Sequence, residues 1–178
     1  GLAGAWIDGE LDLEGVETQL YLTLGYCLFP QQPTLRDAHL GGLFFGGSPC
    51  ESGLFLHRLT TAINVHLREG FHCSGLFDLT EAQIGVLRDD AEAWKVVGEY
   101  HLSGFHYDRL HGPLSLSMRR DWLKKKHAAV LTGPKGRKVS DFDPQPYTHL
   151  ASVLDKAGHR SAAAEILFAR ENKLRQVA

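Results

Sequence analysis

The stretch EGFHCSGLFDL, residues 69–79, holds two features that recur at a fixed distance along the chain. The first is the alternation of Phe77 and Leu79, which places apolar side chains at every second position, as in a strand with one buried face. The second is a cysteine that belongs to a series with intervals of 23 residues: Cys27, Cys50 and Cys73. Recurrence at this distance indicates structural repeats that stack on one another.

Two interleaved series of apolar residues repeat with nearly the same period. One series has spacings of 22, 21, 23 and 23 residues: Leu13, Leu35, Leu56, Leu79 and Leu102. The other has spacings of 21, 22 and 20 residues: Leu24, Phe45, Leu67 and Leu87. Short strands with a period of about 22 residues are typical of a parallel β-helix, in which each coil stacks on the one before it.

The sequence therefore predicts a mainly β fold, a right-handed parallel β-helix of about five coils over residues 1–118. A leucine-rich repeat is the alternative at this period, but it needs a fixed asparagine or cysteine after the leucine strand and a convex helix, and neither pattern is evident. Glycine recurs where the coils must bend: Gly25, Gly47 and Gly70. We expect these residues in the core: Leu13, Leu56, Leu67, Phe77, Leu79 and Leu102.

The three cysteines are expected in the same corner of successive coils. Neighbouring coils lie about 4.8 Å apart, which falls within the Cα–Cα range of disulfides, so oxidation of one adjacent pair is geometrically possible. The favoured interpretation is a column of small buried thiols, closed one period later by an aromatic side chain near residues 94–96. Zinc fits less well, because it takes four tetrahedral ligands and a column supplies three in a row. We therefore predict no metal and no cofactor.

Outward polar residues leave a catalytic site as an alternative. By their phase in the strands, Asp12, Asp78 and His101 share one face. A second group lies one strand further on: Arg88, Asp89 and Asp90. A carbohydrate-active β-helix needs two such carboxylates at a defined separation, yet acidic residues scattered on a solvated face have the same pattern. We predict that the chain is not an enzyme.

Three histidines recur at intervals of five residues: His101, His106 and His111. This spacing suits neither one face of a helix nor one face of a strand, so we interpret them as surface and turn residues rather than as a shared metal site. The stretch LTGPKGRK, residues 131–138, lacks the spacing of a phosphate-binding loop and the strand before it, and is interpreted as part of a linker.

Charge divides the chain into three parts. Residues 1–118 contain 6 basic and 15 acidic residues, residues 119–138 contain 8 and 1, and residues 139–178 contain 5 of each. We expect a basic linker over residues 119–142 that contacts anionic lipid or a partner, lies along the acidic coils, or stays solvated. Its candidate contact residues are Lys124, Lys125, Lys126, Lys135, Arg137 and Lys138, with Arg119 and Arg120 before them.

Residues 143–178 have the pattern of a helical hairpin. Apolar residues follow two prolines at helical spacing: Tyr147, Leu150 and Leu154. Gly158 separates this helix from a second one, which is expected over residues 160–175. A single hairpin of this kind cannot bury its apolar face alone, so we expect it to cap the open end of the coil stack or to contact a partner.

Composition excludes several classes of protein. The chain has 178 residues, of which 43% are hydrophobic, so it can bury a sizeable core. It has no apolar run of the roughly 18 residues that a membrane span needs, and no signal-peptide pattern at its start. Its net charge of −2 does not favour a nucleic-acid binder. Three cysteines are too few for a secreted disulfide framework, which favours a reducing, cytoplasmic setting.

Four segments together resemble a bacterial family of β-helical repeat proteins: GAWIDGELDLEG, VHLREGFHCSGLFDLTEAQIG, LSGFHYDRL and DPQPYTHLASVLDKAGHRSAAAEILFARE. The family is related to pentapeptide-repeat proteins and is often labelled "membrane-associated oxidoreductase". The resemblance covers nearly the whole chain and implies the β-helix, the C-terminal hairpin and a location at the periphery of the inner membrane. It implies no catalytic residues, and the chain has neither G-x-G-x-x-G nor C-x-x-C to support a redox function.

We therefore expect a non-catalytic scaffold that presents a rigid surface to another protein or a larger assembly, with an anionic membrane surface as a further partner and no nucleic acid. Two alternatives come from other classes of protein. One is the carbohydrate-active enzyme that uses the outward Asp, His and Arg residues. The other is an acidic mimic of nucleic acid, as some pentapeptide-repeat solenoids are, which would need a continuous negative stripe.

Overall fold

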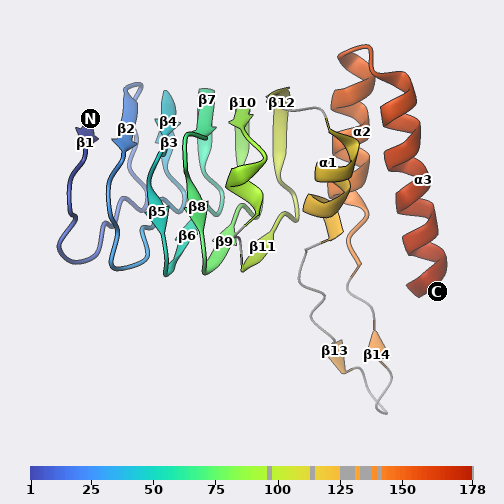
Figure 1. Cartoon of the computed structure of the whole chain (residues 1–178), viewed down its shortest axis with the longest axis horizontal. Helices are drawn as coiled ribbons and strands as arrows, with labels where there is room; N and C mark the ends of the chain where they lie inside the picture. The colour runs from blue at the N-terminus through green and yellow to red at the C-terminus, as the bar shows by residue number, and fades with distance from the viewer. Residues whose placement is uncertain (96–97, 113–114, 125–130, 133–137, 140–141, 178) are drawn as a thin grey trace.

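The computed structural model confirms a parallel β-solenoid of about five turns followed by packed helices (Figure 1). The coils lie side by side along the long axis, with the N-terminus at one end of the stack and the helices at the other. The structure describes residues 1–95, 98–112, 115–124, 131–132, 138–139 and 142–177.

The strands of successive coils form three parallel sheets, one for each side of the coil. The largest sheet has the order β1 (Leu2–Ala3), β2 (Tyr21–Gly25), β4 (Gly42–Phe44), β7 (Thr60–Leu67), β10 (Gln83–Asp89) and β12 (His106–His111), with β3 (His39–Leu40) beside β7. A second sheet contains β6 (Gly53–Phe55), β9 (Leu76–Asp78) and β11 (Glu99–His101). A third contains β5 (Pro49–Cys50) and β8 (His72–Cys73). A separate antiparallel pair joins β13 (Leu131–Thr132) to β14 (Lys138–Val139).

The coils turn at corners where the backbone adopts a left-handed conformation. One corner has such a residue in each of five coils: Gly15, Asp37, Arg58, Glu81 and Gly104. Their φ angles lie between 54° and 70°, a region that strains residues with a side chain. Of the three predicted corner glycines, Gly47 and Gly70 have positive φ. Gly25 instead ends strand β2, and its neighbour Tyr26 takes the left-handed position with φ 53°.

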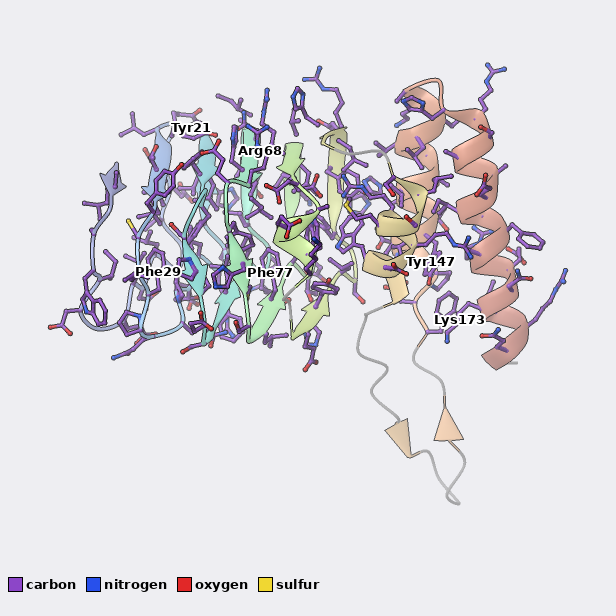
Figure 2. The ribbon with its side chains drawn as sticks, viewed as in Figure 1. Tyr21, Phe29, Arg68, Phe77, Tyr147 and Lys173 are labelled. Atoms are coloured by element: carbon purple, nitrogen blue, oxygen red, sulfur yellow. The ribbon has the colours of Figure 1, made fainter. Side chains whose placement is uncertain are left out.

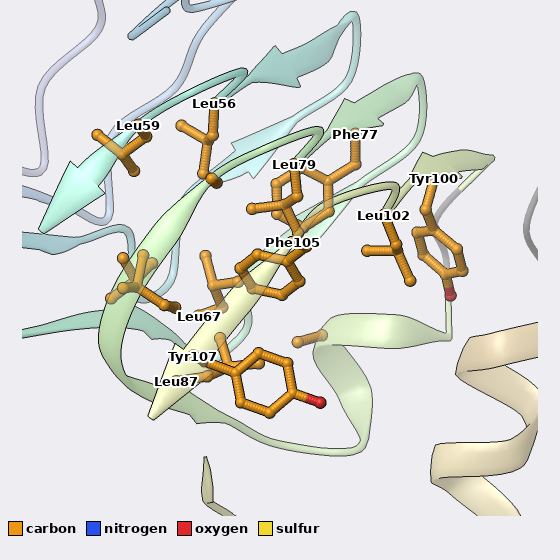
Figure 3. Close-up of a cluster of buried hydrophobic side chains, with 14 of the residues drawn as sticks. Leu56, Leu59, Leu67, Phe77, Leu79, Leu87, Tyr100, Leu102, Phe105 and Tyr107 are labelled. Atoms are coloured by element: carbon orange, nitrogen blue, oxygen red, sulfur yellow. The ribbon is translucent and has the colours of Figure 1, made fainter. Parts of the chain in front are cut away.

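The interior of the coils is a continuous apolar core. Of the predicted core residues, five are at most 1% exposed: Leu56, Leu67, Phe77, Leu79 and Leu102. Figure 3 shows Leu56, Leu79 and Leu102 in a row along the stack. Leu13 is only partly buried, because it belongs to the first coil and no coil of the described chain packs against its other side.

Aromatic rings continue this core into the helices. Phe45 and Phe71 have ring centroids 6.3 Å apart, and Phe71 and Phe77 are 5.8 Å apart. Phe77 stacks on Trp94 at 5.8 Å, and Trp94 contacts Trp122 at 5.1 Å. Trp94 lies in a short 3-10 helix, η1 (Glu92–Trp94), which packs beside β8 as the predicted aromatic end of the cysteine corner.

The C-terminal helices cover the last coil. Helices α2 (Gln145–Lys156) and α3 (Arg160–Val177) form the predicted hairpin, and Gly158 with φ 87° makes the turn between them. Side chains of α2 contact the outer strand edge: Gln145 Oε1 accepts a hydrogen bond from Gly104 N at 3.1 Å. His149 Nε2 lies 3.0 Å from Tyr107 N and 2.9 Å from Tyr107 O. Helix α2 therefore satisfies backbone groups that an open edge would expose.

Another helix, α1 (Leu116–Lys124), precedes the hairpin and overlaps the segment predicted as a basic linker. The side chain of Arg119 in this helix is 0% exposed. It forms an ion pair with Asp89, the last residue of β10. The first residues of the basic segment are thus part of the folded cap. The prediction of a basic linker over residues 119–142 did not anticipate this helix, because nothing in the local pattern marks Arg119 as an inward residue.

Candidate functional site

The outward residues predicted as a catalytic group do not converge. Asp12, Asp78 and His101 do occupy one column, but Thr34 and Phe55 lie between Asp12 and Asp78 in the register. Three coil steps of about 4.8 Å put these two carboxylates about 14 Å apart. The separation in glycoside hydrolases is about 5 to 9.5 Å.

The second predicted group, Arg88, Asp89 and Asp90, does not share one face either. Asp89 was expected on the outer face, but it is 1% exposed and turned inward. Its carboxylate accepts hydrogen bonds from Arg119 and from Trp94 Nε1, the latter at 2.6 Å. Asp90 remains outside and accepts hydrogen bonds from the backbone N–H groups of Glu69 and Ala93. These contacts assign structural roles to both carboxylates.

The thiol column is confirmed for two of its three members. Cys50 pairs with Cys73 in the register of β5 and β8, and all three cysteines are free and buried. The N–H of Cys27 donates to Ser48 Oγ at 2.9 Å, two residues before Cys50. The offset of 23 residues fails here because the neighbouring strands β2 and β4 pair with an offset of 21, Tyr21 beside Gly42.

Burial makes this corner a poor reactive site. It raises the pKa of the Cys73 thiol to about 12 and raises the pKa of Cys50 well above its ordinary value. The thiolate is the form that attacks electrophiles and binds metals, so thiols held protonated at neutral pH do neither. Within the described parts of the chain, no group of three or more His, Cys, Asp or Glu side chains is placed to hold a metal ion.

The predicted histidines are held by local contacts. His101 Nε2 lies 2.9 Å from Glu99 Oε1 on the same strand. His106 Nδ1 lies 2.6 Å from the carbonyl of Gly104, and its ring contacts His149 of the cap at 4.7 Å. His111 is exposed at the end of β12. These positions agree with the interpretation as surface and turn residues.

Most of the predicted basic contact residues lie outside the residues that the structure describes: Lys125, Lys126, Lys135 and Arg137. Lys124 is the last residue of α1 and Lys138 the first of β14, and the positions of their side chains also fall outside the description. Arg120 is exposed on α1. The lipid-contact prediction for this segment therefore rests on its sequence charge.

A different surface, which the sequence reasoning missed, lies at the N-terminal end of the stack. Leu2 pairs with Leu24 in the register of β1 and β2, yet Leu2 is 47% exposed and Leu24 only 2%. The same difference separates Val16, which is 36% exposed, from Ala38 in the next coil, which is fully buried. Within the described residues, core-type side chains of the first coil are thus exposed where those of the next coil are buried.

Large outward side chains extend this apolar area. Trp6 is 67% exposed and pairs with Leu28, which is 45% exposed, and Leu20 is 73% exposed. We call these residues the first-coil surface: Leu2, Trp6, Val16, Leu20 and Leu28. Single exposed apolar side chains are common on protein surfaces, whereas a contiguous patch of them marks an interaction site.

The rim of the first-coil surface is acidic. Five carboxylates lie exposed in the same coil: Asp8, Glu10, Asp12, Glu14 and Glu17. The first basic side chain of the chain is Arg36, in the second coil. This charge pattern is the sequence signal that could have drawn attention to the surface, because the first coil has five acidic residues and no basic one, and acidic and apolar residues alternate from Glu10 to Leu13.

Comparison of the chain with family models, curated proteins and solved structures found no match. Among the described residues, no helix is long and apolar enough to cross a membrane.

Proposed function

We propose that the chain is a non-catalytic solenoid scaffold that binds another protein through the first-coil surface. The observation that carries the proposal is the set of large apolar side chains that are exposed on the first coil within the described residues. At the C-terminal end, Gln145 and His149 of α2 contact the backbone of the last coil. At the N-terminal end, Leu2 and Trp6 are exposed beside a strand edge.

The partner that fits this end is an extended segment that adds to the edge of β1. An edge strand offers alternate backbone N–H and C=O groups to such a segment, and side-chain pockets give specificity. The inward side chains of the segment would be apolar, to pack on Leu2 and Val16. Its outward side chains would be lysine or arginine, because the rim carries five carboxylates and no basic residue.

Charge also argues against two copies meeting end to end through this surface. Each copy would bring the same five carboxylates to the seam, from Asp8 to Glu17. Like charges placed opposite each other across strands are destabilising. A basic partner removes this repulsion and gains attraction from the same carboxylates, so we favour a different protein over a second copy.

A location at a membrane surface is the second element of the proposal. It is supported by the net charge of +7 in residues 119–138 and by the resemblance to β-helical proteins labelled as membrane-associated. Each basic residue near an anionic bilayer is worth about 1 kcal/mol. The expected test is co-sedimentation with vesicles: retention on phosphatidylglycerol but not on phosphatidylcholine, lost when Lys124, Lys125 and Lys126 are replaced by glutamine. Equal retention on both lipids would rule this element out.

Peptide binding tests the main element. The probe is a fluorescein-labelled peptide of alternating valine and lysine, and fluorescence anisotropy reports its binding. Two matched peptides serve as controls. Alternating valine and glutamate reverses the charge, and alternating serine and lysine removes the apolar face. We expect binding of the first peptide only, weakening as salt rises.

Variants locate the site. Leu2→Glu and Trp6→Glu are expected to weaken binding about tenfold or more, while Phe168→Glu, at a side chain 65% exposed on α3, leaves it unchanged. If the serine–lysine peptide binds as tightly as the valine–lysine peptide, charge alone accounts for the binding and the proposal is contradicted. Sedimentation tests for a second copy of the chain at this surface. If the wild type self-associates and Trp6→Glu abolishes the association, the occupant is a second copy and the proposal of a different partner is contradicted.

A further inference from the structure

One column of outward positions on the largest sheet is rich in cationic and aromatic side chains. In the register of β4, β7, β10 and β12 the column contains Phe44, His66, Arg88 and His111. Arg68 follows β7 by one residue and adds a second guanidinium. Figure 2 labels Arg68 and Tyr21 toward the same edge of the sheet, and both Arg68 and Arg88 act electrostatically on Tyr21.

These two arginines differ from three other basic residues of the acidic coils. Arg58 forms a two-point ion pair with Asp37, at 2.5 and 2.6 Å. Arg36 lies over the ring of Phe55 at 4.3 Å, and Lys95 pairs with Glu92. Among the described residues, Arg68 and Arg88 have no carboxylate within ion-pair distance.

Their side chains are also partly removed from water. The Nε atoms of Arg68 and Arg88 and the Nδ1 atom of His66 are buried and lack a hydrogen-bond partner within the described residues. A buried polar atom without a partner costs about 1–3 kcal/mol, and more when the group is charged. Because the Nε atoms are buried, the two guanidinium groups lie near the sheet. Their Nη atoms are the donors available to a ligand.

The carboxylates nearby are already engaged. Glu69 accepts a hydrogen bond from the hydroxyl of Tyr26 at 3.0 Å. Asp90, which lies beside Arg68 in the register, accepts two backbone hydrogen bonds at 3.0 and 2.9 Å. Asp89 is paired with Arg119. No direct hydrogen bond joins any of the three to Arg68 or Arg88 in the part of the chain that is described.

Aromatic rings form one wall of the cluster. The His66 ring lies 5.4 Å from that of Phe44 and 6.2 Å from that of Tyr21. Tyr21 is fixed by a hydrogen bond from its hydroxyl to Asn64 Oδ1. A hollow opens beside the cluster and is lined by Arg68, Glu69, Asp89, Asp90, His111 and Gly112. Arg68 lines this hollow beside three carboxylates that already accept hydrogen bonds, and Arg88 lies next to it on the adjacent strand. The two guanidinium groups, rather than the hollow as a whole, are the feature that suits an anion.

We propose that Arg68 and Arg88, with His111 at the rim, bind a phosphate group. Guanidinium groups match phosphate oxygens with two parallel hydrogen bonds. Arg88 lies in register with His66, two residues before Arg68, so the Cα atoms of the two arginines are diagonal neighbours about 8 Å apart, within reach of two long side chains that converge on one anion. The phosphate belongs either to a small molecule or to a lipid headgroup, since both present the same oxygens. The site is separate from the first-coil surface and does not depend on it.

His66 supplies a reporter of binding. Burial lowers its pKa to about 4, the charges of Arg68, Arg88 and His111 add to this effect, and the charge of Glu69 opposes it. The imidazole is therefore neutral at pH 7. A bound phosphate would offset the nearby positive charge, so the pKa of His66 is expected to rise by about 1 when phosphate is present.

Nuclear magnetic resonance of the full chain tests the proposal with inorganic phosphate as the probe. At constant ionic strength, phosphate should shift the Nε–Hε signals of Arg68 and Arg88 and raise the pKa of His66. Arg68→Gln with Arg88→Gln should abolish the His66 response, whereas Arg58→Gln, at the paired arginine, should leave it intact. Vesicles of phosphatidic acid, compared with phosphatidylcholine, test the lipid source with the same variants.

The site is supported if the wild type responds to phosphate or to phosphatidic acid and the double variant does not. The larger of the two responses shows whether the phosphate comes from a small molecule or from a lipid headgroup. Shifts no larger than those from equal chloride would overturn it, as would a double variant that responds like the wild type. The wild-type His66 titration needs no variant, so it decides the matter even if the double variant fails to fold.

Discussion

Arg119 and Asp89 form a fully buried two-point ion pair between residues 30 positions apart, with distances of 2.5 and 2.8 Å. Trp94 Nε1 donates to the same carboxylate at 2.6 Å. The pair joins helix α1 to the end of β10, so the cap is fixed to the coils by charge as well as by apolar packing. Two buried charges are tolerated here because each satisfies the other.

Removing one partner should therefore be costly. Arg119→Met is expected to lower the free energy of unfolding by about 3–5 kcal/mol, because it leaves the Asp89 carboxylate buried without its cation. Arg120→Met, at the exposed neighbour, should change it by less than about 0.5 kcal/mol. Urea denaturation followed by circular dichroism measures both, and equal values for the two variants would contradict a stabilising role for the pair.

The core prediction concerns Leu79, which is 1% exposed between Leu56 and Leu102 of the adjacent coils. Leu79→Ala should cost about 2–5 kcal/mol, because it removes buried methyl groups and leaves a cavity. Leu20→Ala, at a side chain 73% exposed, is the matched control and should cost little. A loss under about 0.5 kcal/mol for Leu79→Ala in the same denaturation experiment would show that the inward and outward phases are exchanged.

The left-handed corners predict a stabilising change. Glu81 has φ 56°, and the equivalent position in the next coil is Gly104. Glu81→Gly should relieve about 1–2 kcal/mol of backbone strain against an entropic cost of about 0.5–1 kcal/mol, so the melting temperature should rise. Thr80→Gly, one residue earlier, removes no such strain and should lower it. A fall for Glu81→Gly would refute the corner geometry.

The buried thiols predict a loss of stability at high pH. The pKa of Cys73 is raised by burial to about 12, above its value in the unfolded chain. The folded state therefore keeps its proton where the unfolded state has lost it, so this contribution is complete below about pH 8.5 and disappears as the pH approaches 12. Cys73→Ala should flatten the fall in unfolding free energy above pH 9. An unchanged slope would argue against a buried, protonated thiol.

Local sequence patterns were sufficient for the coils and the hairpin. The alternation around Leu79 and the 23-residue interval from Cys50 to Cys73 correctly predicted a buried face and a shared corner, because neighbouring coils repeat the same environment. The position of Cys27 was less well predicted, since the coil offset there is 21 residues.

Non-local pairing explains what the sequence did not reveal. Asp89 stands at an inward strand position, but a charged residue is expected outside unless its partner is known, and Arg119 lies in a segment whose charge suggested a linker. The Nε atoms of Arg68 and Arg88 are buried although both side chains occupy outward strand positions. The exposure of Leu2 likewise depends on its place in the stack of coils, and the residues next to it in the sequence do not indicate it.

Hydrogen–deuterium exchange with the alternating valine–lysine peptide tests the central proposal most directly, because it reads backbone pairing at the first coil without any substitution. An added strand would form hydrogen bonds with the open edge, so amides of residues 2–20 should exchange more slowly when the peptide is bound, and those of α2 and α3 should not change. Protection that is absent from residues 2–20, or that appears instead on the helices, would contradict binding through the first-coil surface.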